Sequence, residues 1–332
     1  MINMHQPLVS IQCLVYNHEN YLRKCLDGII AQKTNFSFEI IVHDDASTDH
    51  SQDIIREYKT KFPNIVKPIY ERENQYSKGE GKLIQLMAKA CKGKYIALCE
   101  GDDFWIDPLK LQKQIDFLEA HQKCSMVCSR TKLYSEQKRK YIGEIRNKHS
   151  NGYLSPQKVI MKGGLYIATV SIVYRKEIRN LNYPSYCLNC VVGDYPLQIM
   201  ASMKGKIYYF DEAMAAYRVE NPISCIGRNK QKNSNKKDYQ KKIIGLRSEL
   251  KMLKGFAEEY PQYRRIFYRR INFYMISLVH KNMESEYYDI FKKELADFLM
   301  ERSLLWRIGY NIRMHAPRIY YEIWKLAAKI GG

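Results

Sequence analysis

Three carboxylates stand close together directly after an apolar run. The run Tyr95–Cys99 is followed by Glu100, Asp102 and Asp103, and then by two aromatic residues. Ionised carboxylates this close repel one another, and a hard divalent cation with oxygen ligands relieves that repulsion. This segment therefore predicts a site for Mg²⁺ or Mn²⁺, with a solvated turn as the alternative.

A second acidic group follows the apolar run Phe38–Val42. Asp44 and Asp45 are adjacent, so a site that keeps both ionised offers them hydrogen-bond donors or a cation. Asp49 precedes a predicted helix, where its side chain would accept free backbone amides of the first turn. We expect a ligand-binding role for Asp44 and Asp45, while an N-cap is an equal alternative for Asp49.

A third carboxylate, Asp194, stands alone between Gly193 and Tyr195-Pro196 at the start of a predicted helix. An isolated acid followed by proline at this position is more often a cap than a catalyst. The residue types alone leave both roles open.

The elements that must position these groups alternate between apolar β-branched runs and amphipathic stretches. This alternation predicts an α/β fold with a mainly parallel, Rossmann-like sheet flanked by helices, and ligands bind beyond the carboxyl ends of such strands. Strands are predicted at Leu8–Tyr16, Phe38–Val42, Val66–Tyr70, Tyr95–Cys99 and Ser125–Ser129, and helices from about Asn20 and at Ser51–Phe62, Leu83–Cys91 and Pro108–His121.

The pattern is less regular after Thr131. Residues 132–151 are rich in charge and are predicted to form a loop, followed by strands at Ala168–Tyr174 and Lys206–Phe210 around a helix at Tyr195–Met203. A polar stretch at 222–235 precedes a helical pattern that runs to the end. We expect a catalytic domain at 1–225, with a nucleotide half at 1–130 and an acceptor half at 131–225, and a basic helical extension at 226–332.

Composition limits the class of protein. The chain has 332 residues, 45% of them hydrophobic, and nine cysteines without a CxxC pair, which favours reduced thiols over a disulfide frame or a zinc site. No stretch approaches the roughly 18 apolar residues of a membrane-spanning helix, and the N-terminus lacks the apolar core of a signal peptide. We therefore expect a cytoplasmic protein.

The net charge of +19 predicts anionic partners, and the surplus is concentrated after Asn221. In the segment 304–330, Ile319, Ile323, Leu326 and Ile330 form one helical stripe among arginines and lysines. Such a helix lies in an anionic membrane surface, so peripheral attachment to the inner face of the cell membrane is one hypothesis. A helix packed on the catalytic domain is an equal alternative.

Three runs become recognisable when they are taken together: Val9–Glu19, Ile40–Asp49 and Gly93–Asp103. Their order and spacing resemble the family 2 glycosyltransferases of the GT-A fold, over roughly Leu8 to Arg218. The resemblance implies a metal-dependent, inverting enzyme. It would transfer a sugar from a nucleotide-diphosphate donor, expected to carry UDP, to a glycan or lipid-linked saccharide during surface polysaccharide synthesis.

The resemblance also implies roles for residues at matching positions. The aromatic Tyr16 would stack on the donor base, and Asp45, with Asp44 beside it, would hydrogen-bond that base. Asp194 would be the general base of an inverting reaction. The remaining expected donor contacts are Asn17, Glu19, Glu100 and Asp102, with Asp102 and Asp103 on the metal.

Two positions depart from the family pattern. Glu100 stands where the metal motif usually begins with Asp, which lengthens that side chain by a methylene group. Glu220 stands where a later family motif often has His. Trp105, Arg218 and Glu220 are the candidate contacts with the acceptor or the phosphates.

Two other functions fit part of the pattern. A nucleotidyltransferase on a related α/β scaffold would also use acidic metal ligands, but the chain has neither a glycine- and lysine-rich phosphate loop nor GxGxxG after the first strand. A basic nucleic-acid-binding protein would explain the charge, but no nucleic-acid motif is found, so we expect no nucleic-acid partner.

Overall fold

The computed structural model describes residues 6–79, 81–179, 183–188, 190, 193–219 and 236–281. Its first half contains β1 (Val9–Val15), α1 (Leu22–Ile30), β2 (Phe38–Asp44), α2 (Ser51–Lys61), β3 (Val66–Tyr70), α3 (Gln75–Lys78), α4 (Lys82–Ala90), β4 (Tyr95–Leu98), β5 (Phe104–Trp105) and α5 (Lys110–Ala120). Its second half contains β6 (Cys124–Ser135), β7 (Lys140–Ile145), β8 (Gly152–Leu154), α6 (Pro156–Lys162), β9 (Val173–Arg175), α7 (Asp194–Lys204), β10 (Lys206–Val219), α9 (Lys236–Glu259) and α10 (Arg264–Lys281), with 3-10 turns η1 (Gly164–Tyr166), η2 (Thr169–Ser171), η3 (Lys176–Ile178), η4 (Ser185–Cys187) and η5 (Pro261–Tyr263).

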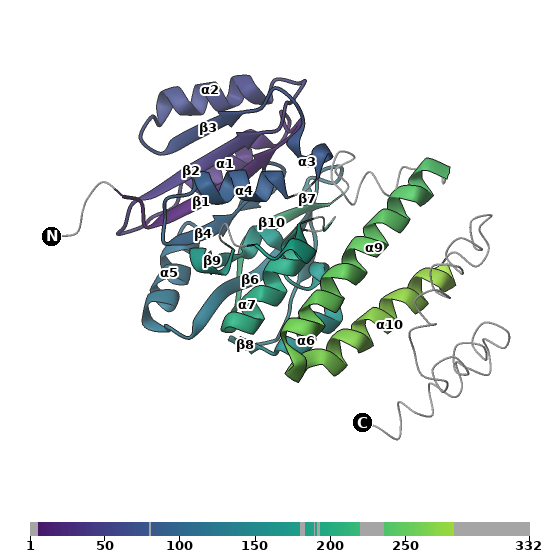
Figure 1. Ribbon diagram of the computed structural model, residues 1–332. Helices are drawn as coiled ribbons and strands as arrows, with labels where there is room; N and C mark the ends of the chain where they lie inside the picture. Colours follow the sequence, from purple (N-terminus) through teal and green to yellow (C-terminus); the bar gives the residue numbers. More distant parts are fainter. Residues whose placement is uncertain are drawn as a thin grey trace, which may run out of the picture.

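Within the described residues, one ten-stranded sheet has the order β3-β2-β1-β4-β9-β6-β10-β5, with β7 beside β6 and β8 beside β10 (Figure 1). The strands β3, β2, β1 and β4 run parallel to one another. β1 is predominantly apolar and buried because it lies in the middle of this group. The predicted α/β fold with a mainly parallel sheet and a helical C-terminal region is confirmed.

The second half of the sheet is mixed. β9 runs antiparallel to both β4 and β6, while β10 runs parallel to β6 and antiparallel to β5. β10 continues to Val219, well beyond the predicted strand Lys206–Phe210. The predicted strand Ala168–Tyr174 is instead the turn η2 followed by the three-residue strand β9.

The predicted loop at 132–151 is wrong over much of its length. β6 continues to Ser135 and pairs with β7 in an antiparallel hairpin. Lys132 Nζ bonds Glu144 Oε2 across the hairpin at 2.9 Å, and the rings of Tyr134 and Tyr141 meet edge to face at 5.5 Å. The charged side chains that suggested a loop therefore stabilise two strands through cross-strand pairs.

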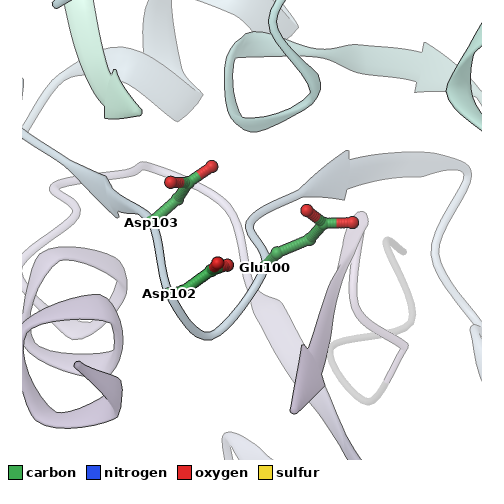
Figure 2. A group of neighbouring side chains, drawn as sticks. All are labelled: Glu100, Asp102 and Asp103. Atoms are coloured by element: carbon green, nitrogen blue, oxygen red, sulfur yellow. The ribbon is translucent and has the colours of Figure 1, made fainter. Parts of the chain in front are cut away.

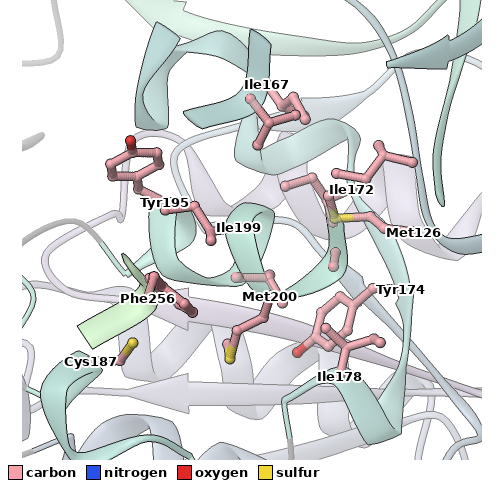
Figure 3. Close-up of a cluster of buried hydrophobic side chains, with 14 of the residues drawn as sticks. Met126, Ile167, Ile172, Tyr174, Ile178, Cys187, Tyr195, Ile199, Met200 and Phe256 are labelled. Carbon is pink, nitrogen blue, oxygen red and sulfur yellow. The ribbon is translucent and has the colours of Figure 1, made fainter. Parts of the chain in front are cut away.

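The helices α9 and α10 share a core with the sheet. Phe256 of α9 and Phe267 of α10 are fully buried, and their rings stack at 5.9 Å. Phe256 belongs to the same buried cluster as Cys187 and as Met200 of α7 (Figure 3). The helical pattern predicted from Lys236 is confirmed as far as Lys281, while the apolar stripe at 304–330 lies outside the described residues.

No helix in the described ranges is both long enough and apolar enough to cross a lipid bilayer.

Candidate active site

The loops that carry the predicted site follow β1, β2 and β4. β1 pairs in parallel with β2 on one side and with β4 on the other, so the three carboxyl ends meet at one edge of the sheet. Backbone hydrogen bonds extend this alignment into the loops: Asp45 N donates to Val15 O at 2.9 Å, and Gly101 N donates to Leu14 O at 2.8 Å. This edge is where open α/β sheets bind ligands.

The loop after β4 brings its three carboxylates together. Ligand oxygens of Glu100, Asp102 and Asp103 all lie within 4.8 Å of one another, and the side chains project from one turn (Figure 2). Glycine lets this turn lie close to the end of β1, because a Cβ on Gly101 would lie 2.7 Å from His18 Nδ1 and 3.2 Å from Leu14 O. We call Glu100–Asp103 the acidic loop.

Burial and mutual repulsion disfavour the ionised form of two carboxyl groups in the acidic loop. Burial, and then the charge of Asp102, raises the pKa of Asp103 well above its usual range. Burial raises the pKa of Glu100 to about 8, with further contributions from the charges of Asp102 and Asp194. Carboxylates in this state favour a cation in their midst.

Asp103 tests whether the residues fit a divalent metal. Its Oδ1 accepts the backbone N–H of Arg218 at 2.8 Å, whereas its Oδ2 is buried and has no hydrogen-bond partner among the described residues. A buried carboxylate oxygen without a partner is unfavourable unless a ligand completes it. With carboxylate oxygens from two neighbours within reach, the donor set suits Mg²⁺ or Mn²⁺.

Arg218 anchors the acidic loop to the end of β10. Its side chain is 1% exposed, with Nε 2.7 Å from Glu136 Oε2 and Nη1 donating to Asp102 O at 2.6 Å. The guanidinium carbon lies 5.0 Å from the ring centroid of Tyr21 and 4.9 Å from that of Phe104. These bonds fix the loop backbone, and a contact between this arginine and a ligand remains a prediction.

Trp105 is also buried and makes its contacts with other residues of the protein. It is 4% exposed, and its Nε1 donates to Val170 O at 3.0 Å. The Nζ of the buried Lys110 lies 4.3 Å from the Trp105 ring and donates to Gln114 Oε1 at 2.7 Å. Burial lowers the pKa of Lys110 to about 7. Acceptor contact by Trp105 stays a prediction, and Glu220 lies outside the described residues.

Asp194 is the first residue of α7 and lies close enough to the acidic loop for its charge to raise the pKa of Glu100. Its Oδ2 accepts the hydroxyl of Thr169 at 2.9 Å, while Oδ1 is shielded from solvent without a partner in the described part of the chain. Burial raises the pKa of Asp194 to about 6. In this carboxylate one oxygen is hydrogen-bonded by the protein and the other has bonding capacity left. Such a group is suited to accepting a proton.

The loops after β1 and β2 are joined by reciprocal hydrogen bonds. Asn17 has a left-handed backbone (φ 57°), donates its N–H to Ser47 Oγ at 2.9 Å, and accepts the amide of Thr48 at 2.8 Å. Glu19 N donates to Asp49 Oδ2 at 2.9 Å. Tyr16 precedes this seam and is half-buried. The expected contacts with the donor from the β1 and β2 ends therefore come from two segments that are fixed against each other.

The adjacent carboxylates of Asp44 and Asp45, at the end of β2, accept hydrogen bonds from the protein, as expected for two acids side by side. Asp45 uses both oxygens to bind the first amides of α3, from Gln75 at 2.6 Å and Tyr76 at 3.1 Å. Asp44 Oδ1 accepts Gln52 Nε2 at 2.7 Å, while its buried Oδ2 has no partner among the described residues.

Asp49 binds a free amide at the start of α2. Its Oδ1 accepts the amide of Ser51, the first residue of α2, at 3.0 Å, although the N-cap position is His50, whose side chain makes no capping hydrogen bond. Asp49 therefore has a structural role at this helix start, as the capping alternative expected, and a role restricted to capping stays a prediction.

Two residues of the site were not among the sequence predictions in these roles. Thr169 lies in a largely apolar run that resembles a strand, and Arg218 contacts the acidic loop mainly through bonds formed by folding. Nothing in either local pattern indicates the partner, because Thr169 and Asp194 are 25 residues apart and Arg218 and Asp103 are 115 apart.

Comparison with known proteins gives a consistent result. The model of glycosyl transferase family 2 matches residues 10–184. An uncharacterized protein of Mycobacterium tuberculosis is 35% identical over 210 residues, which cover 63% of this chain and 58% of that protein. This chain therefore matches little more than half the length of that relative.

Two characterised proteins are similar over different extents. A UDP-Glc:alpha-D-GlcNAc-diphosphoundecaprenol beta-1,3-glucosyltransferase of Escherichia coli is 34% identical over 115 residues, covering 35% of this chain and 43% of the enzyme. The structure of a mannosyltransferase from Pyrobaculum calidifontis in complex with GDP-Man and Mn²⁺ has a TM-score of 0.52 at 14% identity, covering 96% of this chain and 83% of that one. The second similarity shows that the fold is shared.

Proposed function

The chain belongs to glycosyl transferase family 2, and we propose that it transfers a sugar from a nucleoside-diphosphate sugar to a saccharide or lipid-linked saccharide. UDP is the expected nucleotide and a surface polysaccharide the expected product class. One observation carries the proposal: Asp103 Oδ2 and Asp194 Oδ1 are both shielded from solvent and lack partners in the described residues, around one acidic loop. Each is suited to a different part of a transfer reaction.

The carboxylates of Asp102 and Asp103, with Glu100 beside them, would hold Mn²⁺ or Mg²⁺. When bound, such an ion neutralises negative charge on the departing nucleoside diphosphate. The support on this chain is the cluster of three carboxylates and the open, buried oxygen of Asp103. The E. coli and Pyrobaculum relatives, whose names include UDP-Glc and GDP-Man with Mn²⁺, support the same donor class and ion.

Asp194 would act as the general base. Its Oδ1 takes the proton from the acceptor hydroxyl while that oxygen forms a bond to the anomeric carbon of the sugar. The bond between this carbon and the diphosphate oxygen breaks, and the electron pair leaves with the nucleoside diphosphate. Attack in line with the departing group inverts the anomeric carbon. A pKa of about 6 leaves the carboxylate ionised at neutral pH and still basic enough to act.

The nucleotide would bind along the seam between the loops after β1 and β2. Tyr16 would stack on the base, with Asn17, Glu19, Asp44 and Asp45 forming the rest of that wall. The support is the fixed geometry of the seam, together with the open Oδ2 of Asp44. A preformed wall binds its ligand without a further ordering cost.

For the domains, we propose that 1–225 carries the reaction and that 226–332 is the basic extension. Contact of the stripe at 304–330 with an anionic membrane surface is part of this proposal. Truncation after Met300 should abolish co-sedimentation with vesicles that contain anionic lipid. Unchanged co-sedimentation would remove the membrane role and leave the transfer reaction unaffected.

Thermal unfolding with a panel of nucleotide sugars tests the proposed donor. UDP-glucose, UDP-galactose, UDP-N-acetylglucosamine and GDP-mannose would each be added with Mn²⁺, followed by assay of nucleoside diphosphate release. The cognate donor should raise the unfolding temperature most, because at equal concentration the ligand with the lowest Kd for the folded state stabilises it most. A chain that binds none of these donors but binds DNA would contradict the proposal.

A further inference from the structure

The turn η2 is held rigidly between the acidic loop and α7. Val170 O accepts the indole N–H of Trp105 at 3.0 Å, and Ser171 O accepts Gln114 Nε2 at 3.0 Å. Val170 and Ser171 are both fully buried. Because Trp105 follows Asp103 by two residues, the strand that leaves the acidic loop also fixes the backbone next to Thr169.

The other side of this arrangement fixes α7 to the same segment. Gln198, one turn after Asp194, donates its Nε2 to Ile167 O at 3.2 Å and to Gly164 O at 3.0 Å. Tyr195 Oη donates to Ile160 O at 2.6 Å. The first turn of α7 and the segment before Thr169 therefore have a fixed relative position.

The hydroxyl of Thr169 connects η2 to the Asp194 carboxylate at the start of α7. Its Oγ1 donates to Asp194 Oδ2 at 2.9 Å, which leaves Oδ1 as the oxygen without a partner in the described chain. A carboxylate turns easily about its last side-chain bond, since that torsion has broad, roughly two-fold preferences. A hydrogen bond to one oxygen selects one orientation and presents the other oxygen to the reactants.

We propose that Thr169 is the positioning residue of the general base, an inference that rests on the proposed function of Asp194. Its hydroxyl holds Oδ2 so that Oδ1 accepts the proton of the acceptor hydroxyl. The Trp105–Val170 hydrogen bond ties this residue to the strand after the acidic loop. The metal-binding and proton-accepting sides of the site thereby share one anchored turn.

Thr169→Val tests this role, because valine keeps the shape and removes the hydroxyl. The assay is the release of nucleoside diphosphate, with saturating Mn²⁺, from the donor that the panel identifies, and water replaces the acceptor. We expect kcat to fall about 10- to 100-fold, the range for a lost hydrogen bond to a charged group, while the KM for the donor stays within about twofold. Thr169→Ser keeps the donor and should restore kcat to within about threefold of the parent.

Thr34→Val is the matched control. Thr34 is also half-buried and donates its hydroxyl to a carbonyl, Phe36 O at 2.7 Å, but it precedes β2 at the opposite edge of the sheet. Its kcat should equal that of the parent. Should Thr169→Val fail to fold, Thr169→Ala replaces it in the comparison with Thr169→Ser.

Two results would overturn the inference: a parent-like kcat in the variants without the hydroxyl, or a Thr169→Ser variant as slow as Thr169→Val. Asp194→Asn separates this failure from failure of the proposed function. Full turnover in Asp194→Asn would remove the general base itself. An inactive Asp194→Asn beside an unaffected Thr169→Val would remove only the positioning role.

Discussion

The carboxylates after β2 and those around the acidic loop differ in how completely the protein satisfies them. Asp45 and Asp49 use both oxygens to bind backbone amides. Asp103 and Asp194 each have one oxygen held by the protein and one shielded oxygen without a partner in the described residues. A carboxylate whose bonds are all internal stabilises the fold, whereas a half-satisfied one keeps bonding capacity for a ligand at some loss of stability.

Asp44 is intermediate between the two groups. Its Oδ1 is held by Ser47 N and Gln52 Nε2, and its buried Oδ2 lacks a partner in the described part of the chain. By the same criterion, Asp44 rather than Asp45 has the oxygen that remains for a bound nucleotide.

The largest expected contrast is between Asp194→Asn and Asp45→Asn. Loss of the base in Asp194→Asn should lower kcat by about 10²- to 10⁴-fold, while stability is kept or rises because burial disfavours the charge. Asp45→Asn should lower the free energy of unfolding by about 1–2 kcal/mol, since an amide NH₂ would face a backbone N–H. Turnover assays and urea unfolding of both variants measure this. If the two variants lost the same amount of kcat and the same free energy of unfolding, the distinction between fully and half-satisfied carboxylates would fail.

The next effect concerns Asp103 and Mn²⁺. At a concentration about 100 times its Kd, Mn²⁺ should stabilise the parent by about 2.7 kcal/mol and should do so far less in Asp103→Asn. Asp116→Asn, on the exposed face of α5, is the control and should respond as the parent does. Calorimetric titration gives the affinities. An unchanged Mn²⁺ affinity in Asp103→Asn would exclude its open oxygen as a ligand.

The pH dependence sharpens the role of Asp194. Its pKa of about 6 makes the carboxylate the main form above that pH and the neutral acid the main form below it. With Mn²⁺ and donor saturating at every pH, kcat should be level above pH 6 and fall about tenfold for each unit below it. Circular dichroism at each pH checks that the chain stays folded. A profile that stays level down to pH 5 would argue against a base with this pKa.

The smallest effect is expected at the fully satisfied Asp49. Asp49→Ala removes the acceptor for the Ser51 and Glu19 amides and should lower the free energy of unfolding by about 1 kcal/mol. Asp53 is exposed in the first turn of α2, and Asp53→Ala should change the free energy of unfolding by about 0.5 kcal/mol or less. Urea unfolding compares the two. A large loss of kcat in Asp49→Ala with unchanged stability would place Asp49 with the half-satisfied group.

Sequence reasoning succeeded where local patterns are strong. The apolar runs that became β1, β2 and β4, and the acidic groups after β2 and β4, are contiguous in the chain, so their order predicts both the sheet and the edge at which these carboxylates meet. The hairpin of β6 and β7 was missed because its stability comes from cross-strand pairs such as Lys132 with Glu144, which look like loop residues one at a time.

The contacts that distinguish the two kinds of carboxylate were also beyond local patterns. Thr169 reaches Asp194 only after η2 is fixed by Trp105 and Gln114. The amide of Arg218 reaches Asp103 only when β10 returns beside the acidic loop. Such partners are set by topology, and they determine which oxygens remain open.

The packing of α9 has a practical consequence for protein production. Gly255 lies so close to η4 that a Cβ there would be 2.4 Å from the ring of Tyr186, and the neighbouring Phe256 belongs to the same buried cluster as Cys187 and Met200. An expression fragment that ended at residue 225 would leave these apolar side chains facing water. We expect that fragment to self-associate, whereas a fragment that keeps α9 and α10 retains their cover.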